Sequence, residues 1–507
     1  MTRRQAPAVI AACALAAIET TMAQTVPYQS AQRAGAGIVL GPSELPRGGV
    51  FEPRVEAAVQ YAANIELAAD GAPQIDTAGV EVAPGFYASY SSDAILAAID
   101  YSIVGRFWED SDFDDVGQRL RANGQWVAVP EWFGIRGQAS YADAVIDPRD
   151  GLNYGGLGVF GARNLQEVAT ASVSPVLQHR FGDVEVIAEY AYGRTWFLDQ
   201  GKGQRVIGFV SDEDSTDQSA SLSFGTWERG SQFSGRVFYD WERSEYETAL
   251  PFEYERAGLD AGLRISRTLV FVGDVGRESD LEVNTTEGGL DSDFWSVGVR
   301  WEPSDRTVAE ARIGERFFGD SYWFSATHRA HLLEFSASYS EEPTVETRQL
   351  SLGDFEPGQL PPPVPGADFG RLTGSPYVSK DARAGVTAVG SRTRIGLSGF
   401  HVERDYLSGL RPDETGIGVA FDATRQLASN LSADFEISYS DYERDIVPLD
   451  PDPSGGGSSD YDTVVSLRLN RTAGGHLTVG GEAGYLTRSG TIEYDGWWVA
   501  LRLRWTP

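Results

Sequence analysis

The chain has 507 residues, of which 41% are hydrophobic and 11% aromatic, and 57 are glycine. This much apolar and aromatic material excludes a disordered chain. The formal net charge of -31 at pH 7 argues against nucleic acid or an anionic surface as a partner.

The N-terminus has the order of a bacterial secretory signal. Arg3 and Arg4 precede an apolar stretch over residues 6–18, and small residues follow up to Ala23. The apolar stretch is too short to span a membrane. We therefore predict a signal peptide over residues 1–23.

Two features near this signal affect the domain boundaries. Cys13 resembles a lipidation site, but the apolar stretch continues past it, which favours ordinary cleavage after Ala23. Residues 24–52 are rich in glycine and other small residues and are predicted to form a flexible periplasmic leader. The remainder, residues 53–507, is predicted to be one domain.

Alternation of apolar and polar residues recurs through this domain. At its C-terminal end, the odd-numbered residues from Trp497 to Trp505 are apolar, whereas Arg502 and Arg504 lie on the other face of the same strand. These alternating segments run over ten to fifteen residues, about twice the usual length of a strand in a soluble protein. A tilted strand needs about nine to eleven residues to cross a bilayer, so the length favours transmembrane strands.

The predicted strands, in chain order, are 53–66, 77–91, 93–108, 115–129, 132–146, 165–180, 183–198, 214–228, 231–244, 254–266, 268–280, 292–302, 306–317, 320–328, 331–342, 374–388, 391–405, 412–426, 430–443, 459–471, 475–488 and 494–505. They predict an all-β fold: a single transmembrane antiparallel up-and-down β-barrel of about 22 strands, within a range of about 18 to 24. The last strand is expected to close the barrel by pairing with the first strand near residues 55–61.

The predicted connections alternate in length. Those after even-numbered strands are tight, as at Ser91-Ser92 and Gly474-Gly475. Those after odd-numbered strands are mostly long and acidic, as at 147–164 and 343–373. Short periplasmic turns and long extracellular loops are typical of barrels in the outer membrane of Gram-negative bacteria, so this is the predicted location.

The alternation also assigns side chains to the two faces of the wall. Charged residues of both signs are predicted to face a polar lumen: Glu185, Glu189, Arg236, Glu310, Arg312, Glu334, Arg468, Arg502 and Arg504. Apolar residues predicted to face lipid or to form an interfacial girdle include Trp301, Trp497, Leu501, Leu503 and Trp505. Further tryptophans near strand ends are predicted to join the girdle: Trp108, Trp126, Trp132, Trp196, Trp227, Trp241 and Trp323.

The sequence offers two ways in which the lumen could be narrowed. A barrel of about 22 strands leaves a wide interior, and residues 24–52 are too few for a folded plug, although they could tuck into the lumen. The proline-rich segment 358–365 is the best candidate for an inward-folded constriction; the alternative is a stiff external loop.

The candidates for chemistry are weak. His179, His328, His331, His401 and His476 are scattered along the chain, and none has a serine two positions on, so we expect no enzyme and assign no catalytic, cofactor-binding or metal-ligating residue. The acidic loops near residues 212–217 and 450–455 have two interpretations, solvated charge or loose binding of divalent cations that bridge lipopolysaccharide phosphates.

One hairpin carries a family resemblance. The segment contains Trp295, Gly298, Trp301, Pro303, Ser304, Arg306 and Thr307, followed by Gly314, Arg316, Phe318 and Gly319. This pattern resembles the uncharacterised outer-membrane proteins associated with the PEP-CTERM/exosortase system. The resemblance implies a Gram-negative barrel associated with exopolysaccharide genes, and it implies no catalytic residue.

Together these observations predict a passive pore or export channel for exopolysaccharide or another envelope polymer. The alternative is a structural or assembly scaffold with an occluded lumen and no transport. The expected partners are outer-membrane lipid, lipopolysaccharide and the barrel assembly machinery, together with exopolysaccharide or its secretion machinery.

Overall fold

The structure is a computed structural model that describes residues 47–110, 114–145, 153–154, 158–159, 165–198, 214–226, 232–247, 251–280, 291–352, 376–407, 413–444, 458–490 and 493–507. The predicted signal peptide, with Cys13, therefore lies outside the described residues. Within these ranges, no helix is long and apolar enough to cross a membrane.

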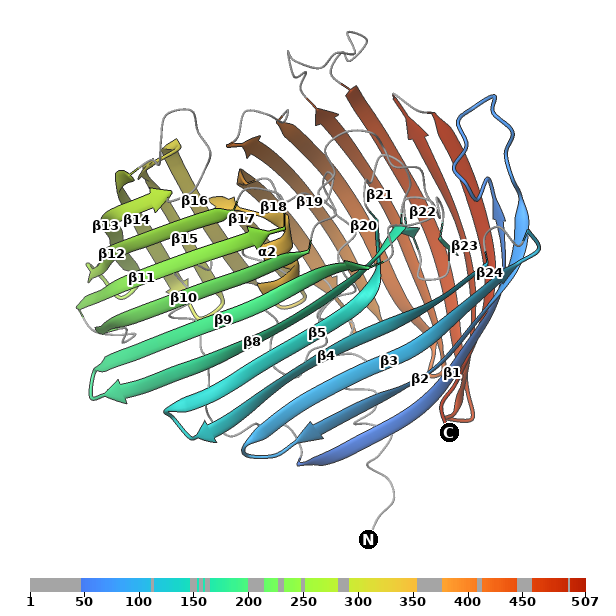
Figure 1. The fold of residues 1–507 in the computed structure, drawn as a ribbon, viewed down its shortest axis with the longest axis horizontal. Helices are drawn as coiled ribbons and strands as arrows, with labels where there is room; N and C mark the ends of the chain where they lie inside the picture. Colours follow the sequence, from blue (N-terminus) through green and yellow to red (C-terminus); the bar gives the residue numbers. More distant parts are fainter. Residues whose placement is uncertain are drawn as a thin grey trace.

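Long strands dominate the described chain (Figure 1). The strands are β1 (Gly48–Ala63), β2 (Thr77–Ser91), β3 (Ile95–Trp108), β4 (Asp115–Val129), β5 (Phe133–Val145), β6 (Asn153–Tyr154), β7 (Gly158–Val159), β8 (Leu165–Phe181), β9 (Val184–Leu198), β10 (Ser215–Thr226), β11 (Phe233–Tyr246), β12 (Phe252–Arg264), β13 (Leu269–Asp280), β14 (Asp291–Ser304), β15 (Thr307–Arg316), β16 (Gly319–Arg329), β17 (Leu333–Thr344), β18 (Tyr377–Val389), β19 (Thr393–Tyr406), β20 (Glu414–Ala428), β21 (Leu431–Arg444), β22 (Ser458–Ala473), β23 (Leu477–Ser489) and β24 (Tyr494–Trp505). A short helix, α2 (Glu346–Leu352), follows β17.

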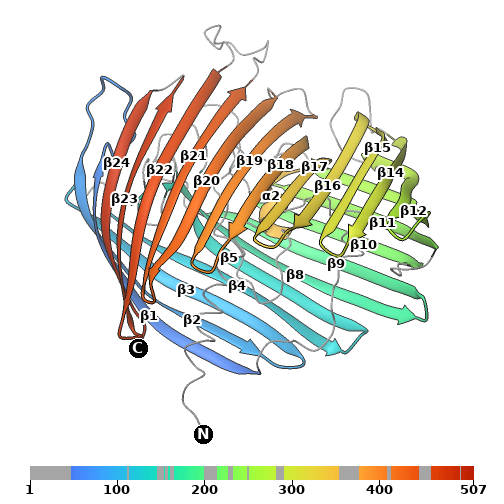
Figure 2. The ribbon, with the colours of Figure 1, turned by 180° about the vertical axis from the view of Figure 1, so that it is seen from behind.

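The strands form one closed antiparallel barrel of 22 strands, and β6 and β7 pair separately. Closure is made by β1 and β24, in a register that runs from Val55 opposite Trp505 to Ala63 opposite Trp497. The ring is visible from both sides in Figures 1 and 2. The predicted fold class and the predicted closing pair are therefore confirmed.

The two faces of the wall differ in polarity, as β24 illustrates. Trp497, Leu501 and Trp505 are 43%, 55% and 48% exposed, whereas the intervening Trp498 and Ala500 are buried. Large exposed apolar side chains occur along most of the other barrel strands as well, and buried polar residues lie on the opposite face. This sidedness is what a barrel in lipid requires, because the backbone is satisfied between strands and only the outer face meets hydrocarbon.

Most of the connections confirm the predicted alternation in length. The C-terminus lies at the end with the short turns, where the Thr506 amide donates to the carbonyl of His476 at 2.8 Å. Most connections at the other end are long, but β15 and β16 are joined there by only Phe317 and Phe318. β15 and β16 are also the shortest strands of the barrel, with 10 and 11 residues.

The first strand begins earlier than the sequence predicted. β1 starts at Gly48, so residues 48–52, which were assigned to the leader, belong to the strand. They are apolar at Val50 and Phe51 and pair with the C-terminal half of β2.

The barrel turns sharply at β12 to β15. The backbones of β13 and β15 approach within 8 Å, although strands two apart in a flat sheet would lie about 9.5 Å apart. Glycines make the bend possible, because a Cβ on Gly276 would lie 2.0 Å from the carbonyl oxygen of Ala257, and one on Gly314 would lie 2.0 Å from that of Trp295. The inner faces of these strands are thereby brought together.

Two tryptophans predicted to join the girdle lie inside the barrel instead. Trp108 is 8% exposed and packs with Ile65, Leu67 and Trp498. Trp323 is 6% exposed and lies beside the Arg312 guanidinium. The girdle prediction was wrong for these two because a ring near a strand end can occupy either face. Trp126 and Trp132, in contrast, are exposed, and Trp227 lies outside the described residues.

Candidate functional site

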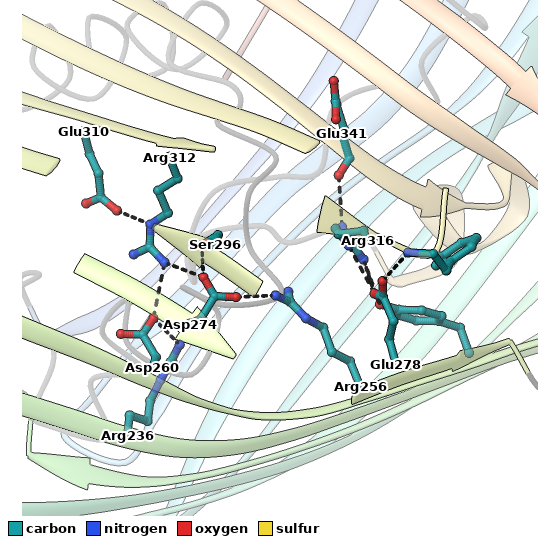
Figure 3. Close-up of polar contacts among 12 residues, drawn as sticks. Arg236, Arg256, Asp260, Asp274, Glu278, Ser296, Glu310, Arg312, Arg316 and Glu341 are labelled. Atoms are coloured by element: carbon teal, nitrogen blue, oxygen red, sulfur yellow. Dashed lines mark hydrogen bonds and ion pairs between the residues drawn. The ribbon is translucent and has the colours of Figure 1, made fainter. Parts of the chain in front are cut away.

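The inner wall at the sharp turn carries a cluster of buried ionic residues, which we term the corner cluster (Figure 3). Each member is at most 8% exposed. The members are Arg236, Arg256, Asp260, Asp274, Glu278, Glu310, Arg312 and Arg316. They come from β11, β12, β13 and β15, and the turn of the wall brings these strands together.

Arg312 is the centre of one half of the corner cluster. Its Nε donates to Glu310 at 2.6 Å, and its Nη1 donates to Asp274 at 3.2 Å and to Asp260 at 3.5 Å. Asp274 also accepts from Arg256 at 2.7 Å and from the Ser296 hydroxyl. A single guanidinium therefore joins carboxylates from three strands.

Glu278 is the centre of the other half. Its Oε2 accepts from Arg316 at 3.1 Å and from the Tyr254 hydroxyl at 2.7 Å, while its Oε1 accepts from the Phe317 amide at 2.7 Å. Arg316 also donates to the Glu341 carbonyl at 3.1 Å. These contacts fix the β15–β16 hairpin against β12 and β13.

The corner cluster contains four arginines and four carboxylates, so its formal charges cancel. Buried charges of one sign would be costly, and pairing with hydrogen bonds offsets that cost. We interpret the corner cluster as a rigid, neutral part of the wall. A cavity of about 20 Å³, lined by Asp274, Arg316 and Trp323 among others, has room for about one water molecule.

A short stretch after β17 folds into the barrel, and we term residues 345–352 the inward segment. It comprises Val345 and α2, and α2 packs against the inner faces of β8, β9 and β10 (Figure 1). Val345 is fully buried against Phe252 and Tyr254 of β12. The chain thus leaves β17, packs on β12 and reaches the inner faces of β8, β9 and β10.

Specific polar contacts hold the inward segment there. The Ser351 hydroxyl donates to Asp217 at 2.7 Å, and Arg348 forms an ion pair with Glu242. Gln138 donates to the Ser351 carbonyl at 3.0 Å. Close packing adds to these contacts, because a Cβ on Gly193 would lie 2.7 Å from a methyl group of Leu352.

The inward segment belongs to the loop after β17, which was the best candidate for a constriction of the lumen. The sequence left open whether the loop after β17 folds inward or projects outward. Its first residues, 345–352, fold inward, whereas the proline-rich residues 358–365 lie outside the described residues.

Away from the corner cluster, some arginines of the inner wall are partly exposed. On β22 to β24, Glu482 is buried and accepts from Arg468 at 3.1 Å and from Trp498 at 3.2 Å, and it pairs with Arg502 at 2.7 Å. The side chain of Arg468 is 38% exposed and that of Arg502 is 26% exposed. These arginines reach open space inside the barrel, unlike those of the corner cluster.

The other predicted lumen residues lie on the same strand faces as buried polar groups. Glu189 pairs with Arg136 at 2.5 Å, and Glu185 accepts from Gln178 at 2.8 Å. Glu334 pairs with Arg329 at 2.9 Å at the exposed short-turn end. Arg504 lies 3.5 Å from Glu56 across the closing pair of strands.

The residues predicted to face lipid, namely Trp301, Trp497, Leu501, Leu503 and Trp505, are each 43–55% exposed. Sequence patterns did not single out Arg256, Asp260, Asp274 or Glu278, and they placed Asp217 in an acidic loop, whereas it is buried in β10. The signal that could have identified them was a charged side chain on the strand face opposite a row of apolar residues. Asp260, between Leu259 and Ala261 on β12, is an example. Their convergence depends on the sharp turn and could not be read from alternation.

The hairpin with the family resemblance is β14–β15. Trp295 and Trp301 are exposed, and a Cβ on Gly298 would lie 2.1 Å from the Ala311 carbonyl oxygen. Pro303, Arg306 and Thr307 lie at the short turn, where the register shifts between Trp301 and Ser304. Of the remaining residues, Arg316 belongs to the corner cluster, Phe318 packs on Phe317, and Gly319 has a φ of +109°.

The histidines lie at separate places. His179 stacks on Trp132, His328 contacts Thr307 at 2.8 Å, and His476 contacts the Thr506 carbonyl at 2.9 Å. Among the described residues, no group of three or more His, Cys, Asp or Glu could hold a metal ion. The acidic loop near 450–455 and residues 212–213 lie outside the described ranges, so loose cation binding there stays a prediction. The prediction of a loop was wrong for residues 215–217, because they begin β10 and Asp217 is buried there.

Comparisons with known proteins support the fold alone. No model of a known protein family matches the chain, and no curated protein matches it. Among solved structures, the siderophore receptor PirA from Acinetobacter baumannii matches with a TM-score of 0.50 and 9% identity, over 91% of this chain and 81% of that chain. The FrpB iron transporter from Neisseria meningitidis matches with a TM-score of 0.50 and 10% identity, over 91% and 83%.

The fold defines the class of the protein. A closed antiparallel barrel with an apolar outer face and a polar inner face is an integral protein of the outer membrane of a Gram-negative bacterium.

Proposed function

We propose that this barrel is a passive pore or export channel that serves exopolysaccharide or another hydroxyl-rich envelope polymer. One observation carries the proposal: inner-wall arginines away from the corner cluster remain accessible. The side chains of Arg121, Arg383 and Arg468 are 35%, 37% and 38% exposed. Guanidinium groups donate several hydrogen bonds in a fixed plane, which suits hydroxyl-rich and carboxylate-bearing polymers.

Two further points are consistent with an envelope polymer as the cargo. Each of these arginines lies near a carboxylate on the wall, so charges of both signs alternate and a neutral or weakly acidic chain meets no strong barrier. The resemblance of the β14–β15 hairpin to proteins of the PEP-CTERM/exosortase system agrees with a role in exopolysaccharide secretion. The proposal assigns no catalytic step to any residue.

The inward segment favours a second candidate function, a scaffold with an occluded lumen. Barrel interiors can be filled by loops or helices as well as by water. The two candidates differ in whether ions cross the barrel.

Planar-bilayer recording of the full purified chain separates the candidates. A pore is expected to give stable, long-lived conductance steps that neutral dextran small enough to enter the lumen reduces. Insertions that never conduct would overturn the pore and support the scaffold. Polymer export is tested separately: deletion of the gene is expected to lower surface polysaccharide, and unchanged polysaccharide beside a conducting pore would overturn only the proposed cargo.

A further inference from the structure

The barrel wall is incomplete between β16 and β17. The ladder joining them ends at Phe324 opposite Tyr339, yet β16 continues to Gly319 and β17 continues to Thr344. The upper part of β17 stays paired with β18, from Ser340 opposite Asp381 to Thr344 opposite Tyr377. Figure 2 shows β16 and β17 diverging toward this end.

A side chain bridges the gap in place of the backbone ladder. Glu341 accepts from the Tyr322 amide at 3.1 Å through Oε2 and from the Tyr339 hydroxyl at 2.5 Å through Oε1. A strand edge in a membrane wall is costly when its amides lack acceptors. The Glu341 carboxylate supplies one such acceptor and holds the two strands near each other.

The small cavity of the corner cluster lies at this gap. Its lining includes Arg256, Arg312 and Arg316 from the inner face, together with Glu341 and the residues from Ser321 to Trp323. It also includes Trp295, which, like Tyr322, is exposed on the outer face, at 43% and 49% respectively. The cavity is therefore bounded partly by wall residues whose side chains lie on the outer face.

We propose that the gap between β16 and β17 is a lateral portal, closed in this structure by Glu341, that admits an amphiphile of the outer leaflet. The acyl chain of such a lipid would remain against Trp295 and Tyr322, and its polar head would enter toward the inner arginines. Opening requires the upper half of β17 to move with β18, because the ladder to β18 is intact and the ladder to β16 is not. This portal is separate from the axial channel and goes beyond the proposed function.

Two serines on the inner face of β16 provide a matched test. Ser321 lines the cavity where the ladder is absent, whereas Ser325 is paired in register with Ser338. The chain has one cysteine, Cys13, within the predicted signal peptide, so a Ser321→Cys or Ser325→Cys variant is expected to carry a single thiol in the mature barrel. The probe is a phospholipid with a maleimide head group, reconstituted with each variant in vesicles.

The portal predicts labelling of the Ser321→Cys variant about tenfold faster than of the Ser325→Cys variant, since an intact wall excludes lipid. Adding Glu341→Ala should raise the rate for Ser321→Cys further, whereas Glu342→Ala, one residue along, should not. Heat-modifiable migration in gels confirms that each variant is a folded barrel. Equal rates for the two thiols, or a rate unaffected by Glu341→Ala, would overturn the portal, whether or not the barrel conducts ions.

Discussion

Leu501 and Arg502 show how much environment can change between neighbouring residues. Leu501 is 55% exposed on the outer face, where hydrocarbon replaces water. Arg502 lies on the inner face, where it pairs with Glu482 at 2.7 Å. The same strand thus needs an apolar side chain at one position and tolerates a charge at the next.

Adding a charge to the outer face and removing one from the inner face should reduce the stability of the barrel by unequal amounts. Leu501→Arg is expected to destabilise the barrel by about 2 to 4 kcal/mol near the bilayer midplane. Arg502→Gln should cost much less, because Glu482 retains its contacts with Arg468 and Trp498. Urea unfolding in lipid vesicles measures both, and equal costs would show that the assignment of the outer face is wrong.

Strands were the level of structure that alternation predicted best. Each predicted strand corresponds to a strand of the barrel, and the bounds of 77–91, 115–129 and 494–505 agree at both ends. The period of two is a property of the strand itself, so it can be read locally. How sharply the wall bends cannot be read locally in the same way, because the bend depends on which glycines of neighbouring strands face one another.

The bend at β12 to β15 is testable through Gly314. Gly314→Ala should destabilise the barrel, because the added methyl would lie 2.0 Å from the Trp295 carbonyl oxygen and the backbone would have to shift. The matched control is Gly481→Ala on β23, where nothing lies within 4 Å of the added atom. The expected outcome is a lower urea midpoint for Gly314→Ala alone; similar midpoints for both variants would contradict the bend.

At the scale of the whole molecule, the inward segment determines the shape of the interior. Val345 packs on β12, and Ser351 reaches Asp217 of β10. The segment therefore leaves the end of β17 and crosses the interior to the inner faces of β12 and β10. Sequence patterns leave such a crossing open, since seven helical residues within a long connection carry no signal of the wall that they contact.

Release of the inward segment should widen the lumen of the barrel. The double variant Arg348→Ala with Ser351→Ala removes the ion pair to Glu242 and the hydrogen bond to Asp217. If the barrel is the proposed pore, its single-channel conductance should rise by about twofold, since a segment in the lumen narrows the aqueous path.

The control for this prediction is Arg468→Ala with Ser466→Ala on β22. It removes the same two side-chain types from the inner wall without freeing a segment. An equal rise in the control would attribute the effect to lost charge and would contradict the role of the inward segment.

The sequence by itself determined the barrel, the length and order of its strands, and the end that carries the long loops. These features follow from a local period of two and from the length needed to cross a bilayer. Only the tertiary structure decided that Asp260, Asp274 and Arg312 meet, that residues 345–352 fold inward, and that β16 separates from β17. Those outcomes depend on how strands far apart in sequence curve toward one another, which alternation along a single strand does not encode.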